Sequence, residues 1–264
     1  MVYQNNFNFS GQNFINNHSI IQNIIKGAKI LPDSLVIEIG PGAGVLTKEL
    51  AKVAKNVLAY EIDTKLENIL DQELKDCTNV NIIFDDFLLR DIKNDIKSYQ
   101  YDNIYAVANI PYYITTPIVL KLIDSKINFQ SITLMVQKEV GDRFTAHIGT
   151  RDYSSITVFL NYYFDLRKLF VVSRNCFTPK PNVDSIVISL VRKDKRLKVD
   201  NEKLFFNLVR DSFHFKRKNL RNNLKKYDLD KVLEVLEKHD KDLTVRAENL
   251  DLETFVDIAN RLSK

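Results

Sequence analysis

Five short apolar runs, rich in β-branched residues, recur through the first half of the chain and constrain its fold more than any other feature. They cover residues 35–39, 56–62, 80–84, 101–108 and 131–136. A helical spacing of apolar residues precedes the first run at residues 19–28, and helical patterns follow at 46–54, 65–75 and 117–124. Strands that alternate with helices predict βαβ units, a mainly parallel sheet and helices on both of its faces. The sequence therefore predicts a Rossmann-like α/β fold.

The pattern changes near residues 192–200. Two more apolar, β-rich runs, at residues 157–164 and 185–191, could supply antiparallel edge strands to the sheet. The polar stretch RKDKRLKVD then occupies residues 192–200, and from Leu204 onward the pattern is helical without a strand signal. In this chain of 264 residues we expect a ligand-binding catalytic domain at 1–195 and a small all-helical domain at 196–264.

Charge and cysteine content narrow the class of protein. The net charge of +4 permits an anionic partner, and residues 214–226, HFKRKNLRNNLKK, carry six Lys or Arg and no acid. Cys77 and Cys176 are isolated, which is typical of reduced thiols in a cytoplasmic protein. No apolar run approaches the roughly 20 residues that span a bilayer, and the N-terminus lacks a secretion-signal pattern. We therefore expect a cytoplasmic protein that makes no use of a membrane.

An acidic, glycine-rich turn lies between the first predicted strand and a helix. Its sequence, EIGPGAG, begins at Glu38 and includes Gly40 and Gly42. It keeps a GxG spacing but is not the GxGxxG dinucleotide fingerprint. Glu61 ends the next strand, where an acid can accept hydrogen bonds from both hydroxyls of a ribose. Asp86 ends the third strand, where a side chain can reach the amino group of an adenine.

These acids and glycines predict a nucleoside-containing ligand, because the carboxyl ends of parallel strands share one edge of a sheet. NAD and S-adenosylmethionine both contain the required adenosine. The turn EIGPGAG is similar to the version found in methyltransferases, and Glu38 would then face the methionine end, whose ammonium needs a partner. We therefore favour S-adenosylmethionine.

The fourth predicted strand ends in the tetrapeptide Asn109-Ile110-Pro111-Tyr112, at the same edge. An aromatic amine such as adenine N6 is a poor nucleophile, because its lone pair is delocalised into the ring. The Asn109 oxygen and a nearby backbone carbonyl could accept its two N–H groups and aim the lone pair at a methyl group. Pro111 would stiffen the loop and leave carbonyls free, and Tyr112 could stack on the base. The tetrapeptide predicts methylation of an amine.

With these residues in place, the chain resembles the ribosomal RNA adenine dimethyltransferases over nearly its whole length, and most closely the branch that acts on small-subunit rRNA. The shared motifs are GQNFI at residues 11–15, EIGPGAG, Glu61-Ile62-Asp63, Asp86, NIPYYITTPI at 109–118, QKEV at 137–140, FTPKPNVDS at 177–185, KRKNLRNNL at 216–224 and RAENL at 246–250. Three of these motifs, QKEV, KRKNLRNNL and RAENL, favour the small-subunit branch over the large-subunit enzymes that confer macrolide resistance.

The resemblance implies a site and a reaction. Cofactor contacts would come from Asn13, Ile15, Gly40, Gly42, Glu61, Asp86 and Asn109, with catalysis at Asn109, Ile110, Pro111 and Tyr112. The reaction would be two methylations on each of two adjacent adenines near the 3′ end of small-subunit rRNA, within a pre-30S particle. Phe177 would pack against the flipped base opposite Tyr112. We expect a monomer.

A basic helix is expected around residues 216–226. Its cations suit RNA phosphates, with Lys216, Arg217, Lys218 and Arg221 as the contacts, while Phe213, Phe215, Leu220 and Leu224 would anchor it to the core. One departure from the family is the absence of basic residues just before Gly11, where Phe7-Asn8-Phe9-Ser10 stands instead. This makes an RNA contact by that arm doubtful.

Three other readings compete. The first is a large-subunit methyltransferase, which a subunit-selective assay distinguishes. The second is an RNA-binding assembly or transcription factor without chemistry, which has no need of an intact tetrapeptide and acidic edge. The third is a NAD-dependent oxidoreductase, which the absence of GxGxxG and of a hydride-chemistry acid or base disfavours. The scattered histidines, His18, His147, His214 and His239, and the lack of a metal cluster offer no alternative site.

Overall fold

A computed structural model describes residues 14, 15, 17–109 and 114–264 of the chain. It divides into two compact units: residues 1–138 with 168–189, and residues 139–167 with 190–264. The units are discontinuous in sequence, since each is built from two stretches of the chain. The division into domains at 1–195 and 196–264 stays a prediction.

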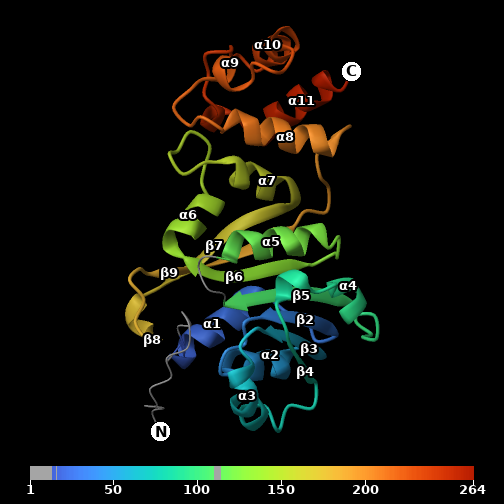
Figure 1. The fold of residues 1–264 in the computed structure, drawn as a ribbon, viewed down its shortest axis with the longest axis vertical. Helices are drawn as coiled ribbons and strands as arrows, with labels where there is room; N and C mark the ends of the chain where they lie inside the picture. The colour runs from blue at the N-terminus through green and yellow to red at the C-terminus, as the bar shows by residue number, and fades with distance from the viewer. Residues whose placement is uncertain (1–13, 16, 110–113) are drawn as a thin grey trace. The chain divides into compact units, whose positions relative to one another are not determined.

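A seven-stranded sheet runs in the order β4-β3-β2-β5-β6-β9-β7 (Figure 1). β2 pairs in parallel with β3 and with β5, β3 with β4, and β5 with β6. The predicted Rossmann-like sheet and its five parallel strands are therefore confirmed. The strands are β2 Ser34–Ile39, β3 Asn56–Glu61, β4 Val80–Phe84, β5 Asn103–Asn109, β6 Ser131–Gln137, β7 Phe164–Val172 and β9 Ser185–Arg192. A separate antiparallel pair joins β1 (Phe14–Ile15) to β8 (Phe177–Thr178).

Helices of the first unit cover both faces of this sheet. On one face, α1 (His18–Ala28) and α2 (Val45–Val53) pack isoleucine and leucine side chains onto valines of β2, β3, β5 and β9. Leu70 of α3 (Glu67–Glu73) packs beside β4 on this face, together with Leu66 and Leu74 at the two ends of the helix. On the opposite face, the ring of Tyr60 meets that of Phe87, 5.1 Å between centroids, in the 3-10 helix η2 (Phe87–Leu89). α5 (Thr115–Asp124) packs against η2, and α4 (Ile92–Asp95) follows it in the chain.

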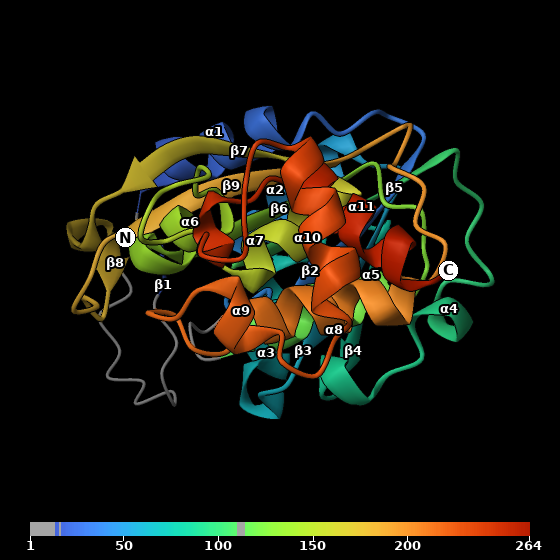
Figure 2. The same cartoon turned by 90° about the horizontal axis from the view of Figure 1, so that it is seen from above.

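The second unit is helical and has its own core. Its helices are α6 (Lys138–Phe144, of which all but the first residue belong to the unit), α7 (Ser155–Tyr163), α8 (Glu202–Ser212), α9 (Leu220–Asn223), α10 (Leu229–Lys238) and α11 (Leu252–Leu262). α11 packs against α8 and α10, and α7 packs against α8 (Figure 2). The helical character predicted from Leu204 onward is confirmed. Within the described ranges, no helix is long and apolar enough to cross a membrane.

The strand predicted at residues 157–164 is wrong, because this segment forms α7. The Thr157 hydroxyl accepts a hydrogen bond from the backbone N–H of Ser154 (3.2 Å) and donates one to the carbonyl of Arg143 (2.7 Å). These bonds fix the first turn of a helix, and Val158 and Tyr162 are buried in the core of the second unit. β-branched and aromatic residues fit a buried helix as well as a strand, so the pattern alone was ambiguous. The strand predicted at 185–191 is confirmed as β9, while β7 follows α7 directly and forms the edge.

The basic helix predicted at residues 216–226 is also wrong. Lys216, Arg217 and Lys218 lie in a turn, and only Leu220–Asn223 form a helix, α9. Asn219 caps α9 by accepting a hydrogen bond from the N–H of Asn222 (3.2 Å). A side-chain amide bonded to backbone groups favours a cap or a turn over a helix interior, which explains the break.

The expected anchors of this segment are only partly correct. Leu220 and Leu224 are buried, and Phe213 packs partly buried against the same core. Phe215, by contrast, is 57% exposed. A helical spacing already separates these two phenylalanines, because residues two apart point to nearly opposite sides of a helix and only Phe213 shares a face with Leu220 and Leu224.

Candidate functional site

The strand order predicts a ligand-binding site at the carboxyl ends of β2 and β5. From β2 the chain proceeds to β3 and β4 on one side, then crosses to β5 on the other side of β2. Such a switch point leaves room for a ligand beyond the strands. Ile39 pairs with Tyr60 on β3 and with Ala108 on β5. Gly40, Glu61 and Asn109 each follow one of these three paired residues. They therefore lie side by side at the ends of three adjacent strands.

The glycine turn approaches Asn109 closely. Gly40 has φ of +75°, and a Cβ at this position would lie 3.3 Å from the carbonyl oxygen of Asn109. Gly44 has φ of +81°, and its Cβ would lie 3.1 Å from a methyl of Leu70. Left-handed backbone and close contact both favour glycine at these two positions. The predicted glycine turn and the predicted catalytic asparagine thus meet at one edge.

Glu61 holds the glycine turn through its carboxylate. Its Oε2 accepts a hydrogen bond from the backbone N–H of Gly42 (3.1 Å), and its Oε1 accepts one from Asp63 (3.0 Å). The residue is 1% exposed, and burial raises the pKa of its carboxyl, opposed by these backbone N–H donors. Each carboxylate oxygen has two lone pairs, so both can also accept a ligand hydroxyl. The arrangement suits a ribose.

Glu38 is a buried acid without a hydrogen-bond partner among the described residues. It is 1% exposed, and neither of its oxygens accepts a hydrogen bond from the residues that the structure describes. Burial raises the pKa of Glu38 to about 8; the nearby hydroxyl of Thr47 moderates the shift and Glu61 adds to it. A buried unpartnered carboxyl is costly unless a ligand supplies a donor or a positive charge. Glu38 therefore fits a cationic group.

Replacing Glu38 by glutamine is expected to change how stability depends on pH. The folded pKa of about 8 lies above the unfolded value of 4.5, so the unfolded state releases this proton first. The free energy of unfolding therefore falls as pH rises through this window, by up to about 1.4 kcal/mol per pH unit. Glu38→Gln lacks this loss, so its stability relative to the wild type should rise from pH 5 to pH 8. Urea unfolding of the ligand-free proteins at several pH values measures it; a constant difference would contradict the burial of an unpaired carboxyl.

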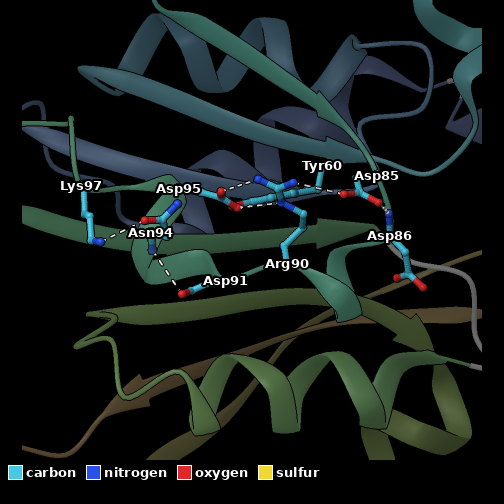
Figure 3. Close-up of polar contacts among 8 residues, drawn as sticks. All are labelled: Tyr60, Asp85, Asp86, Arg90, Asp91, Asn94, Asp95 and Lys97. Atoms are coloured by element: carbon cyan, nitrogen blue, oxygen red, sulfur yellow. Dashed lines mark hydrogen bonds and ion pairs between the residues drawn. The ribbon is translucent and has the colours of Figure 1, made fainter.

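Asp86 begins the turn after β4. Its Oδ1 accepts a hydrogen bond from the backbone N–H of Leu88 (2.9 Å) and so caps η2. The residue is partly exposed, and its carboxylate points away from Arg90 (Figure 3). Its other oxygen forms no hydrogen bond with the described part of the chain, which leaves it free to accept one from a ligand amino group.

An ion-pair network behind Asp86 escaped sequence analysis. Arg90 donates two hydrogen bonds to Asp95 (3.1 and 2.5 Å) and one to Asp85 (3.2 Å), and the Tyr60 hydroxyl donates to Asp95 (3.1 Å) (Figure 3). Burial and the Asp95 carboxylate raise the pKa of Tyr60, which keeps it a donor. Asp85 accepts a hydrogen bond from the N–H of Asp86 (2.8 Å), so the network holds the backbone at Asp86. The only sign of this network in the sequence is the run of acids around Arg90. Tyr60 lies far from that run in the chain, on β3.

The remaining predicted site residues either pack with the core or lie outside the described part of the chain. Ile15 pairs with Phe177 between β1 and β8, and both side chains pack in the core beneath α1. Phe177 is 4% exposed, and its predicted contact with a flipped base stays a prediction. Asn13, Ile110, Pro111 and Tyr112 lie outside the described residues. Among the residues that are described, no group of three or more metal-ligating side chains occurs.

The predicted RNA contacts belong to the second unit. Lys216, Arg217, Lys218 and Arg221 are all exposed to solvent, the first three in the turn before α9 and the last within it. The backbone N–H of Arg221 donates to the carbonyl of Leu243 (3.0 Å), which ties α9 to the chain after α10. The cations are therefore presented from a fixed segment.

Comparison with known proteins identifies relatives of this fold and site. The family model described as ribosomal RNA adenine dimethylase matches residues 3–264. The ribosomal RNA small subunit methyltransferase A of Clostridium botulinum (strain Loch Maree / Type A3) is 45% identical over 257 residues, covering 96% of this chain and 93% of that protein.

Two solved structures are similar over most of the chain. The dimethyladenosine transferase from Plasmodium falciparum has a TM-score of 0.78 at 29% identity, covering 93% of this chain and 95% of that one. The 23S rRNA methyltransferase ErmE has a TM-score of 0.76 at 28% identity, covering 96% and 100%. Both similarities extend over the sheet and the helical unit alike.

Proposed function

The chain belongs to the ribosomal RNA adenine dimethylase family, and from this membership we propose that it dimethylates N6 of two adjacent adenines near the 3′ end of small-subunit (16S) rRNA. It is an S-adenosylmethionine-dependent methyltransferase. The observation that carries the chemistry is the meeting of Asn109 with the glycine turn at the switch point. The observation that supports the target is the 45% identity, over 96% of the chain, to a small-subunit methyltransferase.

The residues at the sheet edge fit S-adenosylmethionine. Glu38 is buried, forms no hydrogen bond within the described ranges and would take the ammonium of the methionine part. Glu61, held by the N–H groups of Gly42 and Asp63, would accept the ribose hydroxyls. Asp86 has an oxygen left for the adenine amino group. When bound, the cofactor supplies a methyl group on a positively charged sulfur.

Asn109 would position the target amine. Its backbone lies against Gly40, so a base held by its side chain would lie beside the cofactor. An amide oxygen that accepts one N6 hydrogen favours a tetrahedral nitrogen, with its lone pair directed outward. The site therefore needs no strong base, because orientation supplies most of the rate. Ile110, Pro111 and Tyr112 would complete the pocket for the flipped base, with Phe177 as a second aromatic contact.

The exposed cations of the second unit would bind RNA phosphates. Replacing Lys216, Arg217 and Lys218 together by alanine should weaken binding to small ribosomal subunits and reduce its dependence on salt. Three lost phosphate contacts would flatten the slope of log K against log salt by about 2. Binding assays on unmethylated small subunits at several salt concentrations measure both quantities.

A matched control for this prediction is the alanine replacement of three exposed lysines of the first unit, Lys75, Lys93 and Lys97, which removes the same charge. It should alter affinity much less. Equal losses in the two variants would show that net charge, rather than the turn, governs RNA binding.

The experiment that tests the proposed target is a choice between particles. Purified unmethylated small and large subunits are incubated with the protein and cofactor carrying a labelled methyl group. We expect label in the small-subunit RNA only. Label in the large-subunit RNA instead would establish the alternative, a large-subunit adenine methyltransferase of the kind that ErmE represents.

The cellular setting follows from this target. The partner would be a pre-30S particle, in which the 3′ end of the rRNA is still accessible, and the protein would act as a monomer in the cytoplasm during ribosome biogenesis. Sedimentation of the protein alone and with small subunits tests the monomer and the partner together. A stable dimer in solution would contradict the proposed monomer.

A further inference from the structure

Phe215 is exposed on the turn between α8 and α9. Its side chain is 57% exposed, although the sequence predicted that it anchors to the core. Three cations, Lys216, Arg217 and Lys218, follow it directly. The ring of His214 packs against it at 4.4 Å between centroids, nearly perpendicular to it. A large aromatic ring is therefore held in solvent at the start of a basic turn.

The side chain of Asn223 gives this turn a defined shape. Its Oδ1 accepts a hydrogen bond from the N–H of Phe215 (3.1 Å). Its Nδ2 donates to the carbonyls of Ser212 (2.7 Å), Phe215 (3.3 Å) and Lys218 (3.4 Å). Phe215 and Lys218 are also joined by a backbone hydrogen bond of 2.8 Å. The aromatic ring and the cations are thus presented together before any partner binds.

The charges of the turn are unmatched on its own surface. Lys216, Arg217 and Lys218 form no ion pair with the residues that the structure describes. The nearest acid in sequence, Asp211, already binds Lys226 (2.8 Å) and the hydroxyl of Tyr227 (2.6 Å). Free cations beside an exposed aromatic ring match a single-stranded nucleic acid, in which phosphates lie next to accessible base faces. The carboxylates of an acidic protein would match the cations but would not stack on the ring.

We propose that Phe215 stacks on an unpaired base of the RNA substrate, while the following cations bind adjacent phosphates and Asn223 holds the turn in this arrangement. The inference rests on the proposed function, since it takes ribosomal RNA as the substrate, and it adds a contact remote in sequence from the catalytic tetrapeptide. Stacking tolerates any base, so this contact adds affinity and register without selecting a sequence.

Three substitutions at Phe215 separate stacking from simple apolar contact. Phe215→Ala removes the ring, Phe215→Leu keeps an apolar side chain without a flat face, and Phe215→Trp enlarges the face. The position is exposed, so none of them should disturb folding. In equilibrium binding to unmethylated small subunits we expect Ala and Leu to weaken affinity by roughly 5- to 100-fold and Trp to retain it. The salt slope should stay unchanged, because no charge is removed.

The chain contains no tryptophan, so the Phe215→Trp variant carries a single reporter at the proposed contact. Its emission should be quenched when small subunits bind. Val171→Trp is the matched control, because Val171 is 53% exposed and belongs to the first unit. Asn223→Asp in the Phe215→Trp background removes the three donated bonds, and we expect weaker quenching at saturating particle concentration. Unchanged quenching would remove Asn223 from the proposal.

The outcomes distinguish this inference from the proposed function. If the wild-type protein methylates small subunits but Phe215→Ala binds them as tightly, stacking is refuted and the proposed function stands. If Leu retains full affinity and Ala does not, the partner of Phe215 is an apolar protein surface rather than a base, which also overturns the inference. If the wild-type protein neither binds nor methylates small subunits, the proposed function fails.

Discussion

Asn109→Ala is expected to lower the rate of methyl transfer by roughly 10²- to 10³-fold while leaving cofactor affinity largely unchanged. Asn109 ends β5 with its carbonyl against the glycine turn, so its side chain would act on the base more than on the cofactor. The loss of one positioned polar group that acts in the transition state lowers kcat by roughly 10²- to 10³-fold. Single-turnover transfer to saturating small subunits measures it, with calorimetry for cofactor binding.

Asn103 offers a matched control, because it is an asparagine at the opposite end of the same strand. Asn103→Ala should transfer methyl groups at nearly the wild-type rate. Unaltered turnover in Asn109→Ala would refute the role assigned to Asn109. A similar loss in both variants would point to damage of the sheet instead.

The second large effect is expected at Glu61. Glu61→Ala removes the acceptor for the N–H groups of Gly42 and Asp63, and with it the proposed acceptor for two ribose hydroxyls. Each hydrogen bond to a charged group contributes about 1.5–3 kcal/mol, so cofactor affinity should fall by roughly 100-fold or more. Calorimetric titration with S-adenosylmethionine measures the dissociation constant.

Glu61→Gln separates the proposed binding of the ribose from the support that this side chain gives to the glycine turn. Glutamine keeps one oxygen acceptor and the shape of the residue but loses the charge, so affinity should fall less than in Glu61→Ala. Thermal unfolding without cofactor reports on the glycine turn by itself. An unchanged dissociation constant in Glu61→Ala would remove Glu61 from the cofactor site.

The parallel sheet and its ligand-binding edge could be predicted from sequence, because local pattern and fold agree there. Buried parallel strands are continuous apolar runs, and each of the five ends in a polar residue or is followed directly by a polar residue or a glycine. Since parallel strands bring their carboxyl ends together, the chain positions of Glu38, Glu61, Asp86 and Asn109 were enough to place them at one edge.

The features that sequence did not reveal depend on contacts between distant residues. Residues 157–164 have the composition of a strand, but Ser154, Thr157 and Arg143 fix a helix there. Arg90 joins Asp95 and Asp85, while Tyr60 reaches the same network from β3. No spacing rule predicts such contacts, because they depend on the packing of η2 and α4 against the sheet.

The turn at Phe215 also depends on side-chain contacts that a reading of the apolar pattern does not reveal. Phe213, Leu220 and Leu224 are spaced as on one face of a helix, yet amide side chains at Asn219 and Asn223 bind backbone groups and end the regular pattern. Reading asparagine clusters as caps, rather than as polar helix residues, would have identified the break. The consequence is functional, since it exposes the ring that we propose stacks on RNA.

The central claim is tested most directly by counting the product. Unmethylated small subunits are treated with the wild-type protein and S-adenosylmethionine, and their RNA is digested and analysed for nucleosides. We predict two N6,N6-dimethyladenosines per particle, both from adjacent positions near the 3′ end, and almost none after the same reaction time with Asn109→Ala. Small subunits that gain no dimethyladenosine, or that gain methyl groups on another base, would contradict the account.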